Sequence, residues 1–163
     1  MTHSTLTRRA LAIAAVSAAA FSVATPAQAQ TDIQWWHSMT AVNGEWVNDL
    51  AKEFNASQKE YRIIPTFKGT YDESMTAAVA AFRAGNAPHI LQVFEVGTAT
   101  MMASKGAIVP VGKVMADAGQ KFDPKAYIPA VAGYYTAPNG QMLSFPFNSS
   151  TTCLLYTSPS PRD

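Results

Sequence analysis

The chain has 163 residues, with twelve basic and eleven acidic side chains and 48% hydrophobic residues. This near-neutral balance excludes the broad basic surface of a nucleic-acid-binding protein and a polybasic membrane patch. Its one cysteine, Cys153, excludes a disulfide framework, so we expect a fold that is held by its hydrophobic core alone.

Residues 1–29 have the order of segments that is found in a cleavable secretory signal peptide. Arg8 and Arg9 are followed by the apolar stretch 10–24, and Ala27-Gln28-Ala29 offers small residues for cleavage. The stretch is too short for a membrane anchor, and no cysteine stands at the cleavage site to carry a lipid. We expect a free periplasmic protein exported by the general secretory route, with twin-arginine export as the alternative.

After cleavage, residues 30–152 suffice for one domain, in which strand and helix patterns alternate. The aromatic and β-branched run 33–37 predicts a strand, and Asn43 or Gly44 is the expected cap of the next helix. Apolar residues recur on one face of that helix, at Trp46, Val47, Leu50, Ala51 and Phe54. Residues 61–67 predict a second strand, which Pro65 places at a sheet edge or a bulge.

A second helix and a third strand follow the turn at 68–70. The helix is marked by apolar spacing and ended by Gly85-Asn86; its apolar residues are Met75, Ala78, Val79 and Phe82. The nearly continuous apolar run 89–95 predicts a strand covered on both faces, as in a parallel sheet. Glu95 would then end this strand, with its carboxylate at the rim of the sheet.

Shorter elements complete the domain. Gly97-Thr98 leads into a short helix, and residues 111–118 predict another. Segments 133–136 and 141–145 flank Pro138-Asn139-Gly140, which predicts a β-hairpin. The alternation of strands and helices predicts an α/β domain of three layers with a mainly parallel sheet.

The last residues, 153–163, read CLLYTSPSPRD and resemble the translation of a sequencing adaptor. A plain Ser/Pro-rich tail is the alternative that the composition would permit. The abrupt change after an orderly strand pattern favours the adaptor interpretation. We therefore expect residues 153–163 to be a non-native tail without a role in function.

Ligands of parallel α/β sheets bind beyond the carboxyl ends of the strands. Polar or aromatic clusters follow the expected strands at residues 36–38, 69–71, 95–98 and 148–151. Because these ends meet at one rim of the sheet, the clusters predict a small-molecule site there.

The same clusters lie in longer motifs, which read WHSM at 36–39, FKGTY at 67–71, AFRAGNAP at 81–88, VFEVGTATMM at 93–102 and PFNSST at 146–151. Together these motifs resemble the periplasmic sn-glycerol-3-phosphate-binding proteins of Ugp-type ABC importers, which belong to the family 1 extracellular solute-binding proteins. The resemblance runs from about residue 33 to residue 151. It implies a periplasmic-binding-protein-like fold, a two-lobed clamp of which residues 30–152 are most of the first lobe.

The resemblance further implies that Tyr71, Glu95 and Ser150 contact the ligand, since each lies in a matched motif. The implied ligand is sn-glycerol-3-phosphate or a glycerophosphodiester such as glycerophosphocholine. The implied partners are the inner-membrane permease subunits of an ABC importer, and the protein would be a monomer. No cofactor, metal or nucleic acid is expected.

Each of these residues also has a plainer interpretation. A carboxylate beside a phosphate would repel it, so Glu95 suits the polyol end of the ligand, but it could equally cap a helix or form a surface ion pair. Tyr71 offers a ring face and a hydroxyl, yet its position alone favours mere packing. Ser150 offers hydroxyl and backbone donors, although a plain Ser/Thr loop has them too. His37, beside a strand end, is more often structural than catalytic.

Two other functions remain as alternatives. One is an oligosaccharide-binding member of the same class, which the visible residues alone do not distinguish. The other is a secreted glycerophosphodiester hydrolase that would use Glu95, His37 and Ser150. The hydrolase is disfavoured because these residues follow no known triad order, and because the sequence holds no nucleophile elbow, metal-spaced His/Cys cluster or Walker loop.

Overall fold

The structure, a computed structural model, describes residues 29–149 apart from Lys105, and within this range the side chains of Glu95 and Val96 are also left undescribed. The expected tail at 153–163 and nearly all of the expected signal peptide lie outside the described residues, as does Ser150. In the part that is described, no helix is long and apolar enough to cross a membrane.

Parallel strands form the centre of the fold, in the order β2-β1-β3. β1 (Thr31–His37) pairs with β2 (Tyr61–Phe67) along its whole length, from Thr31↔Tyr61 to His37↔Phe67. Among the described strands β2 is an edge, so the prediction from Pro65 is confirmed: proline lacks the N–H that a strand on the outer side would need. The parallel α/β pattern expected from the sequence is therefore present.

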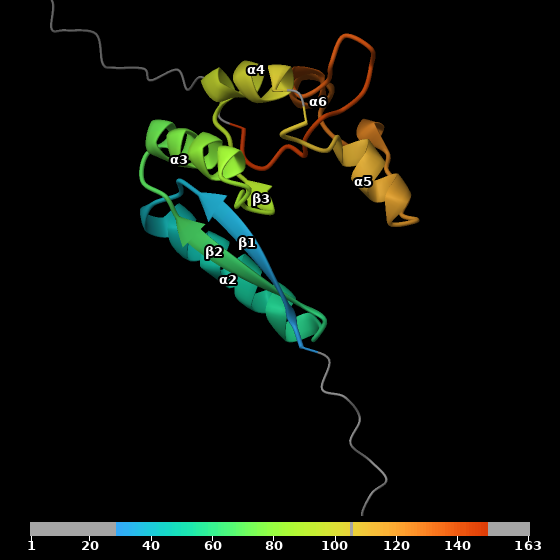
Figure 1. Ribbon diagram of the computed structural model, residues 1–163. Helices are drawn as coiled ribbons and strands as arrows, with labels where there is room; N and C mark the ends of the chain where they lie inside the picture. The colour runs from blue at the N-terminus through green and yellow to red at the C-terminus, as the bar shows by residue number, and fades with distance from the viewer. Residues whose placement is uncertain (1–28, 105, 150–163) are drawn as a thin grey trace, which may run out of the picture.

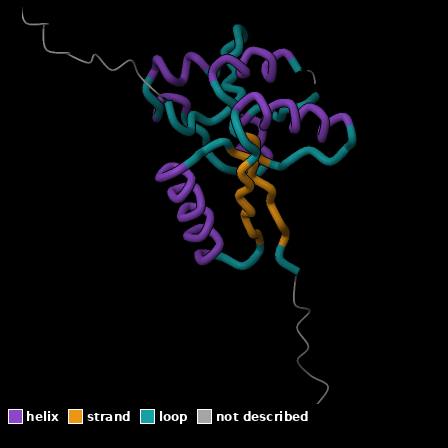
Figure 2. Tube along the Cα trace, turned by 90° about the vertical axis from the view of Figure 1, so that its left-hand side faces the viewer, coloured by secondary structure: helices purple, strands orange, loops and turns teal. Residues whose placement is uncertain are grey.

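Two helices connect these strands and lie on opposite faces of the sheet. α2 (Ala41–Ser57) joins β1 to β2, and α3 (Tyr71–Arg83) joins β2 to β3 (Ile90–Leu91). β2 and β3 lie on opposite sides of β1, so two right-handed crossovers must run over opposite faces. Figures 1 and 2 show this arrangement, with α2 along one side of the strands.

The beginning of α2 differs from the prediction. The helix begins at Ala41 after Thr40, so Asn43 and Gly44 lie inside its first turn and neither is the cap. The Gly44 N–H already donates to the Thr40 carbonyl at 3.2 Å. A Cβ atom at Gly44 would stand 3.0 Å from the carbonyl oxygen of Met39, so this glycine serves a close approach and does not end the loop.

The predicted third strand over 89–95 is wrong in length. β3 pairs with β1 only at Trp35↔Ile90 and Trp36↔Leu91, after which the Gln92 N–H donates one more bond to the Trp36 carbonyl. β1 itself ends at His37, opposite Gln92 in this register, so the residues after Gln92 have no β1 residue to pair with. Glu95 consequently begins a helix, α4 (Glu95–Ala103), and does not end a strand.

The remaining elements are short and lie toward the carboxyl ends of the strands in Figure 1. α5 (Val111–Asp117) confirms the predicted helix, and the 3₁₀ turn η1 (Pro124–Ala126) precedes α6 (Pro129–Tyr134). The predicted hairpin is wrong in its first arm, because Pro129 opens a helix that takes up Gly133 and Tyr134. Its turn at 138–140 is present, and one antiparallel bridge, Thr136↔Met142, closes it.

Candidate functional site: the rim at the carboxyl ends of the strands

His37 closes β1 and has a structural role. Its side chain is only 3% exposed, and its Nδ1 accepts a hydrogen bond of 3.3 Å from the Met39 N–H. Its carbonyl accepts a bond of 2.9 Å from the Lys68 N–H, which ties the loop after β2 to the end of β1. Burial lowers the pKa of His37 below 6.5, so the imidazole is neutral at pH 7. His37 therefore holds the end of β1 and the loop after β2 in place.

The loop after β2 is fixed by a capping box at the start of α3. The Thr70 hydroxyl accepts from the Glu73 N–H at 3.3 Å, and the Glu73 carboxylate accepts from the Thr70 N–H at 2.7 Å. Gly69 has a φ of +81°, a conformation that glycine adopts at little cost and that turns the chain into the helix. This local bonding places Tyr71 as the first residue of α3, at the rim.

Tyr71 stacks on Phe94, which immediately precedes Glu95. The ring centres are 5.3 Å apart and the planes are inclined by 20°. Gly97 allows α4 to come this close, because a Cβ there would stand 2.5 Å from Cε of Met75 and 2.9 Å from Cε1 of Phe94. The stack therefore brings the start of α3 and the start of α4 together at one place on the rim.

A chain of side-chain hydrogen bonds brings the segment before Ser150 to the same rim. The Ser38 N–H donates to Oε1 of Gln92 at 3.0 Å, and Nε2 of Gln92 donates to Oδ1 of Asn148 at 3.2 Å. Asn148 Nδ2 in turn lies 3.3 Å from the sulfur of Met39. These contacts join residues that are 54 to 109 positions apart in the sequence.

The two adjacent tryptophans of β1 lie on opposite faces of the sheet, because successive side chains of a strand alternate. Trp35 meets Phe147 edge-on at 5.5 Å, and Phe147 stacks on Trp46 of α2 at 5.2 Å. Trp36 lies on the other face, where the Lys68 ammonium nitrogen is 3.9 Å from the centre of its ring. Trp35 thus packs toward α2, and Trp36 lines a hollow.

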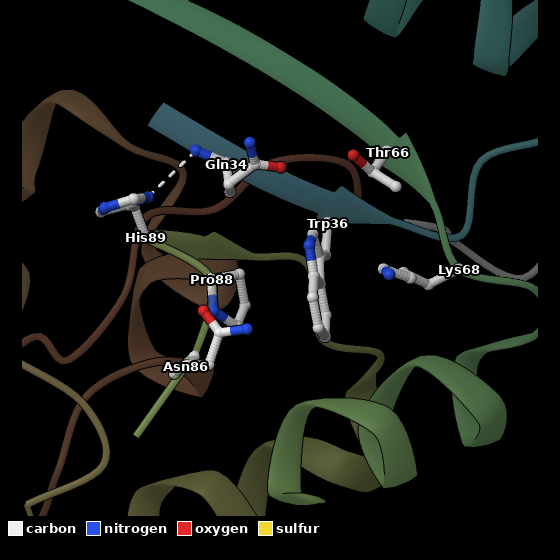
Figure 3. A pocket seen from close by; sticks show the side chains of 8 residues that line it. Gln34, Trp36, Thr66, Lys68, Asn86, Pro88 and His89 are labelled. Carbon is white, nitrogen blue, oxygen red and sulfur yellow. Dashed lines mark hydrogen bonds between the residues drawn. The ribbon is translucent and has the colours of Figure 1, made fainter. Parts of the chain in front are cut away.

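That hollow has a volume of about 320 Å³ and is open to one side of the sheet. Figure 3 shows its lining: Gln34, Trp36, Thr66, Lys68, Asn86, Ala87, Pro88 and His89. The His89 ring is held at the edge of the hollow, because its Nδ1 accepts a hydrogen bond of 3.0 Å from the Gln34 N–H. Tyr71 is not among the described residues that line it, so the hollow and the predicted site are different places.

The chain matches the family model of bacterial extracellular solute-binding proteins over residues 49–159. It belongs to this family. It is 49% identical over 150 residues to the sn-glycerol-3-phosphate-binding periplasmic protein UgpB of Brucella suis, across 92% of this chain and 35% of that protein. It is 56% identical over 131 residues to UgpB of Pectobacterium atrosepticum, across 80% of this chain and 29% of that protein.

UgpB of Rhizobium meliloti is 50% identical over 137 residues, which are 84% of this chain and 32% of the relative. The resemblance read from the motifs is therefore confirmed. This solute-binding chain spans about a third of the length of the curated relatives that it matches. What those relatives bind is a property of proteins that are about three times as long.

In this member of the solute-binding family, Tyr71 lies beside Phe94, the residue that precedes Glu95. Tyr71 and the backbone of Glu95 come together through the Tyr71–Phe94 stack. The Glu95 side chain and the whole of Ser150 lie outside the described residues, so their contacts remain a prediction. Within the described ranges, no group of three or more His, Cys, Asp or Glu residues comes together to hold a metal ion.

Gln92 and Asn148 are the residues that sequence reasoning missed as partners. One signal was available: Gln92 is a polar residue in the middle of the apolar run ILQVF at 90–94. A polar side chain in such a run needs a hydrogen-bond partner when it is buried. The identity of that partner, 56 positions away, could not be read from the sequence.

Proposed function

We propose that this chain contains most of the first lobe of a periplasmic solute-binding protein that serves an ABC importer. Its ligand would be sn-glycerol-3-phosphate or a related glycerophosphodiester. The observation that carries the proposal is the identity of about 50%, across 84% to 92% of this chain, to proteins named for binding this ligand. The expected signal peptide would deliver the protein to the periplasm, where it would act as a monomer and pass its ligand to permease subunits in the inner membrane.

The rim would supply one face of a clamp. Tyr71 would lay its ring and hydroxyl against the small polar ligand, and its stack on Phe94 would hold the ring in place. Glu95 would accept hydrogen bonds from glycerol hydroxyls, at the end away from the phosphate because like charges repel. Ser150 would donate its hydroxyl to a ligand oxygen.

A second lobe would supply the opposing face and most donors for the phosphate. Closure would exclude water from between the lobes and so strengthen each polar contact, since hydrogen bonds are electrostatically stronger at low dielectric. Release would need only reopening, because no bond of the ligand is made or broken. Binding would therefore be reversible.

The geometry of His37 supports binding over hydrolysis. A general base must reach the proton that it removes, yet this imidazole is buried and its Nδ1 already accepts the Met39 N–H. Of the residues that a hydrolase would use, His37 is therefore committed to the fold. The names of the relatives, which describe binding proteins, agree with this interpretation.

Calorimetric titration of the full-length protein with sn-glycerol-3-phosphate, glycerophosphocholine and maltose tests the proposal. We expect saturable heat from one or both phosphorylated ligands, little heat from maltose, and no product in a phosphorus NMR spectrum of the mixture. The 163-residue chain alone is the matched control, and we expect it to bind poorly with one face of the clamp. Heat from maltose alone would contradict the assignment of a phosphorylated ligand and indicate an oligosaccharide-binding protein. Appearance of a hydrolysis product would show that the protein is a hydrolase.

A further inference from the structure

We propose that Gln92 is a positioning residue that holds the loops of the rim in one arrangement for ligand binding. This inference rests on the proposed function, because it concerns the same rim. Gln92 would act through other residues and not by touching the ligand. Its carboxamide stands between the loop after β1 and the segment that leads to Ser150.

Gln92 lies where β3 leaves the sheet. Its backbone N–H makes the last ladder bond, of 2.9 Å, to the Trp36 carbonyl. The next bond is made by its side chain, because Oε1 of Gln92 accepts the N–H of Ser38, just past the end of β1, at 3.0 Å. The carboxamide thereby continues the pairing past the end of the strand and satisfies a backbone donor that is partly buried.

The Ser38 N–H sets the donor and acceptor directions of the contacts that run from Ser38 through Gln92 and Asn148 to Met39. A backbone N–H can only donate, so the Gln92 atom that faces Ser38 must be its oxygen. The nitrogen of Gln92 then faces Asn148 and must meet an oxygen, which turns the Asn148 nitrogen toward the sulfur of Met39. Each amide has one orientation that satisfies its neighbours, and this makes the arrangement specific.

The loops held in this way carry predicted ligand contacts. Glu95 follows Gln92 by three residues, and Ser150 follows Asn148 by two. Because only one residue separates Ser150 from Asn148, we expect loss of the Asn148 bond to weaken the predicted Ser150 contact, since a binding site tolerates little displacement. A neutral amide also fits this place better than a carboxylate would, because the proposed ligand is an anion.

Replacement of Gln92 by methionine in the full-length protein tests the proposal. Gln92→Met keeps the length of the side chain but removes both hydrogen bonds, leaving the Ser38 N–H and the Asn148 oxygen without their partner. We expect the affinity for sn-glycerol-3-phosphate to fall by about tenfold, the equivalent of one such loss. Hydrogen exchange at the Ser38 amide should become faster in the same variant, whether or not ligand is present.

Gln58→Met is the matched control. Gln58 also bonds backbone groups, accepting from the Glu60 and Tyr61 N–H groups at 2.7 and 2.8 Å, but it does so at the amino end of β2. We expect its loss to lower stability while the affinity stays within about twofold. This comparison separates positioning at the rim from general loosening of the sheet.

Gln92→Glu gives a second readout. A carboxylate still accepts the Ser38 N–H but cannot donate to Asn148, so we expect slow exchange at Ser38 together with weaker ligand binding. Equal affinities of Gln92→Met and the unsubstituted protein, or equal losses in Gln92→Met and Gln58→Met, would overturn the inference. If the unsubstituted protein bound no sn-glycerol-3-phosphate, the proposed function would fail, whereas unchanged Ser38 exchange in Gln92→Met would refute the positioning role by itself.

Discussion

The sheet half of the molecule (residues 30–92) and the helical half (residues 93–149) are built on different principles. The sheet half has a continuous register between β1 and β2 and helices of 17 and 13 residues. Side chains reinforce it, as where Asn55 of α2 bonds both the N–H and the carbonyl of Ile63 in β2. The helical half has helices of six to nine residues and a single isolated bridge among its described residues.

This difference shows which parts of such a lobe can be specified locally. When strands pair along their full length and are joined by an amphipathic helix, the local sequence pattern is enough to predict each element. The short segments of the helical half instead share one isolated bridge among the described residues, Thr136↔Met142. They also contain Gly97, Asn148 and the start of α4, which shape the rim. The half that is less regular therefore carries much of the proposed function.

The largest effect is expected from the core of the sheet half. Val47 is fully buried under the sheet, and Val47→Ala should lower the free energy of unfolding by about 2–3 kcal/mol, through lost apolar burial and a residual cavity. Val42→Ala is the control in the same helix, because Val42 is 72% exposed and should cost little. Urea unfolding measures both, and equal costs would mean that α2 does not pack as described.

The contact between the halves is expected to give the next effect. Phe147→Leu removes the stack on Trp46 and the edge contact with Trp35, aromatic pairs that are worth about 0.5–1.5 kcal/mol each. All tryptophans of the chain lie in the sheet half, so their fluorescence reports on it. We expect a shifted emission for Phe147→Leu and no shift for Phe145→Leu, whose ring contacts Phe122. An unshifted Phe147→Leu spectrum would indicate that the halves do not meet there.

The capping box of α3 should contribute about 1 kcal/mol. Thr70→Ala removes the hydroxyl that accepts the Glu73 N–H, so it should lower the melting temperature of the protein by an amount that corresponds to this free energy. Thr76→Ala, in the exposed interior of the same helix, should be neutral or slightly stabilising because alanine favours helices. Melting curves followed by circular dichroism distinguish the two, and loss of stability in both variants would contradict a capping role.

The smallest effect is a pH dependence. The hydrogen bonds from the Thr70 backbone and side chain hold the pKa of Glu73 below its ordinary value of 4.5. A folded-state pKa below the unfolded one stabilises the protein above the ordinary value, and this contribution disappears as the pH falls through the folded pKa. Glu73→Gln should therefore flatten the decline of the melting temperature below about pH 4.5. A decline of unchanged steepness would show that Glu73 does not contribute.

Most of the sheet half could be predicted from its sequence, because its signals are local. Residues 33–37 and 61–67 are rich in aromatic and β-branched residues, as strands are. Pro65 indicated an edge, and the spacing of Met75 and Ala78 indicated the helix that the structure shows. The cap of α2 was missed because Gly44 resembles a loop residue, while its actual role is to admit the Met39 carbonyl. That role depends on a contact and not on a pattern.

The third strand and the hairpin could not be predicted, for a different reason. The length of a strand is set by its partner, and β1 ends at His37 before the apolar run 90–94 is complete. The first arm of the hairpin fails for a similar reason. Tyr134 is a residue that favours strands, but Pro129 begins a helix that includes it. At the site, the motif containing Tyr71 was recognisable, whereas the chain of bonds from Ser38 through Gln92 to Asn148 joins segments that no local pattern connects.

The central claim is that the rim at the carboxyl ends of the strands binds the ligand, and replacement of Tyr71 tests it most directly. Calorimetric titration of the full-length protein with sn-glycerol-3-phosphate should give an affinity that is at least about tenfold weaker in Tyr71→Ala. Tyr61→Ala is the control, because Tyr61 begins β2 at the opposite end of the sheet and should leave the affinity unchanged. A Tyr71→Ala variant that binds as tightly as the unsubstituted protein would contradict the account.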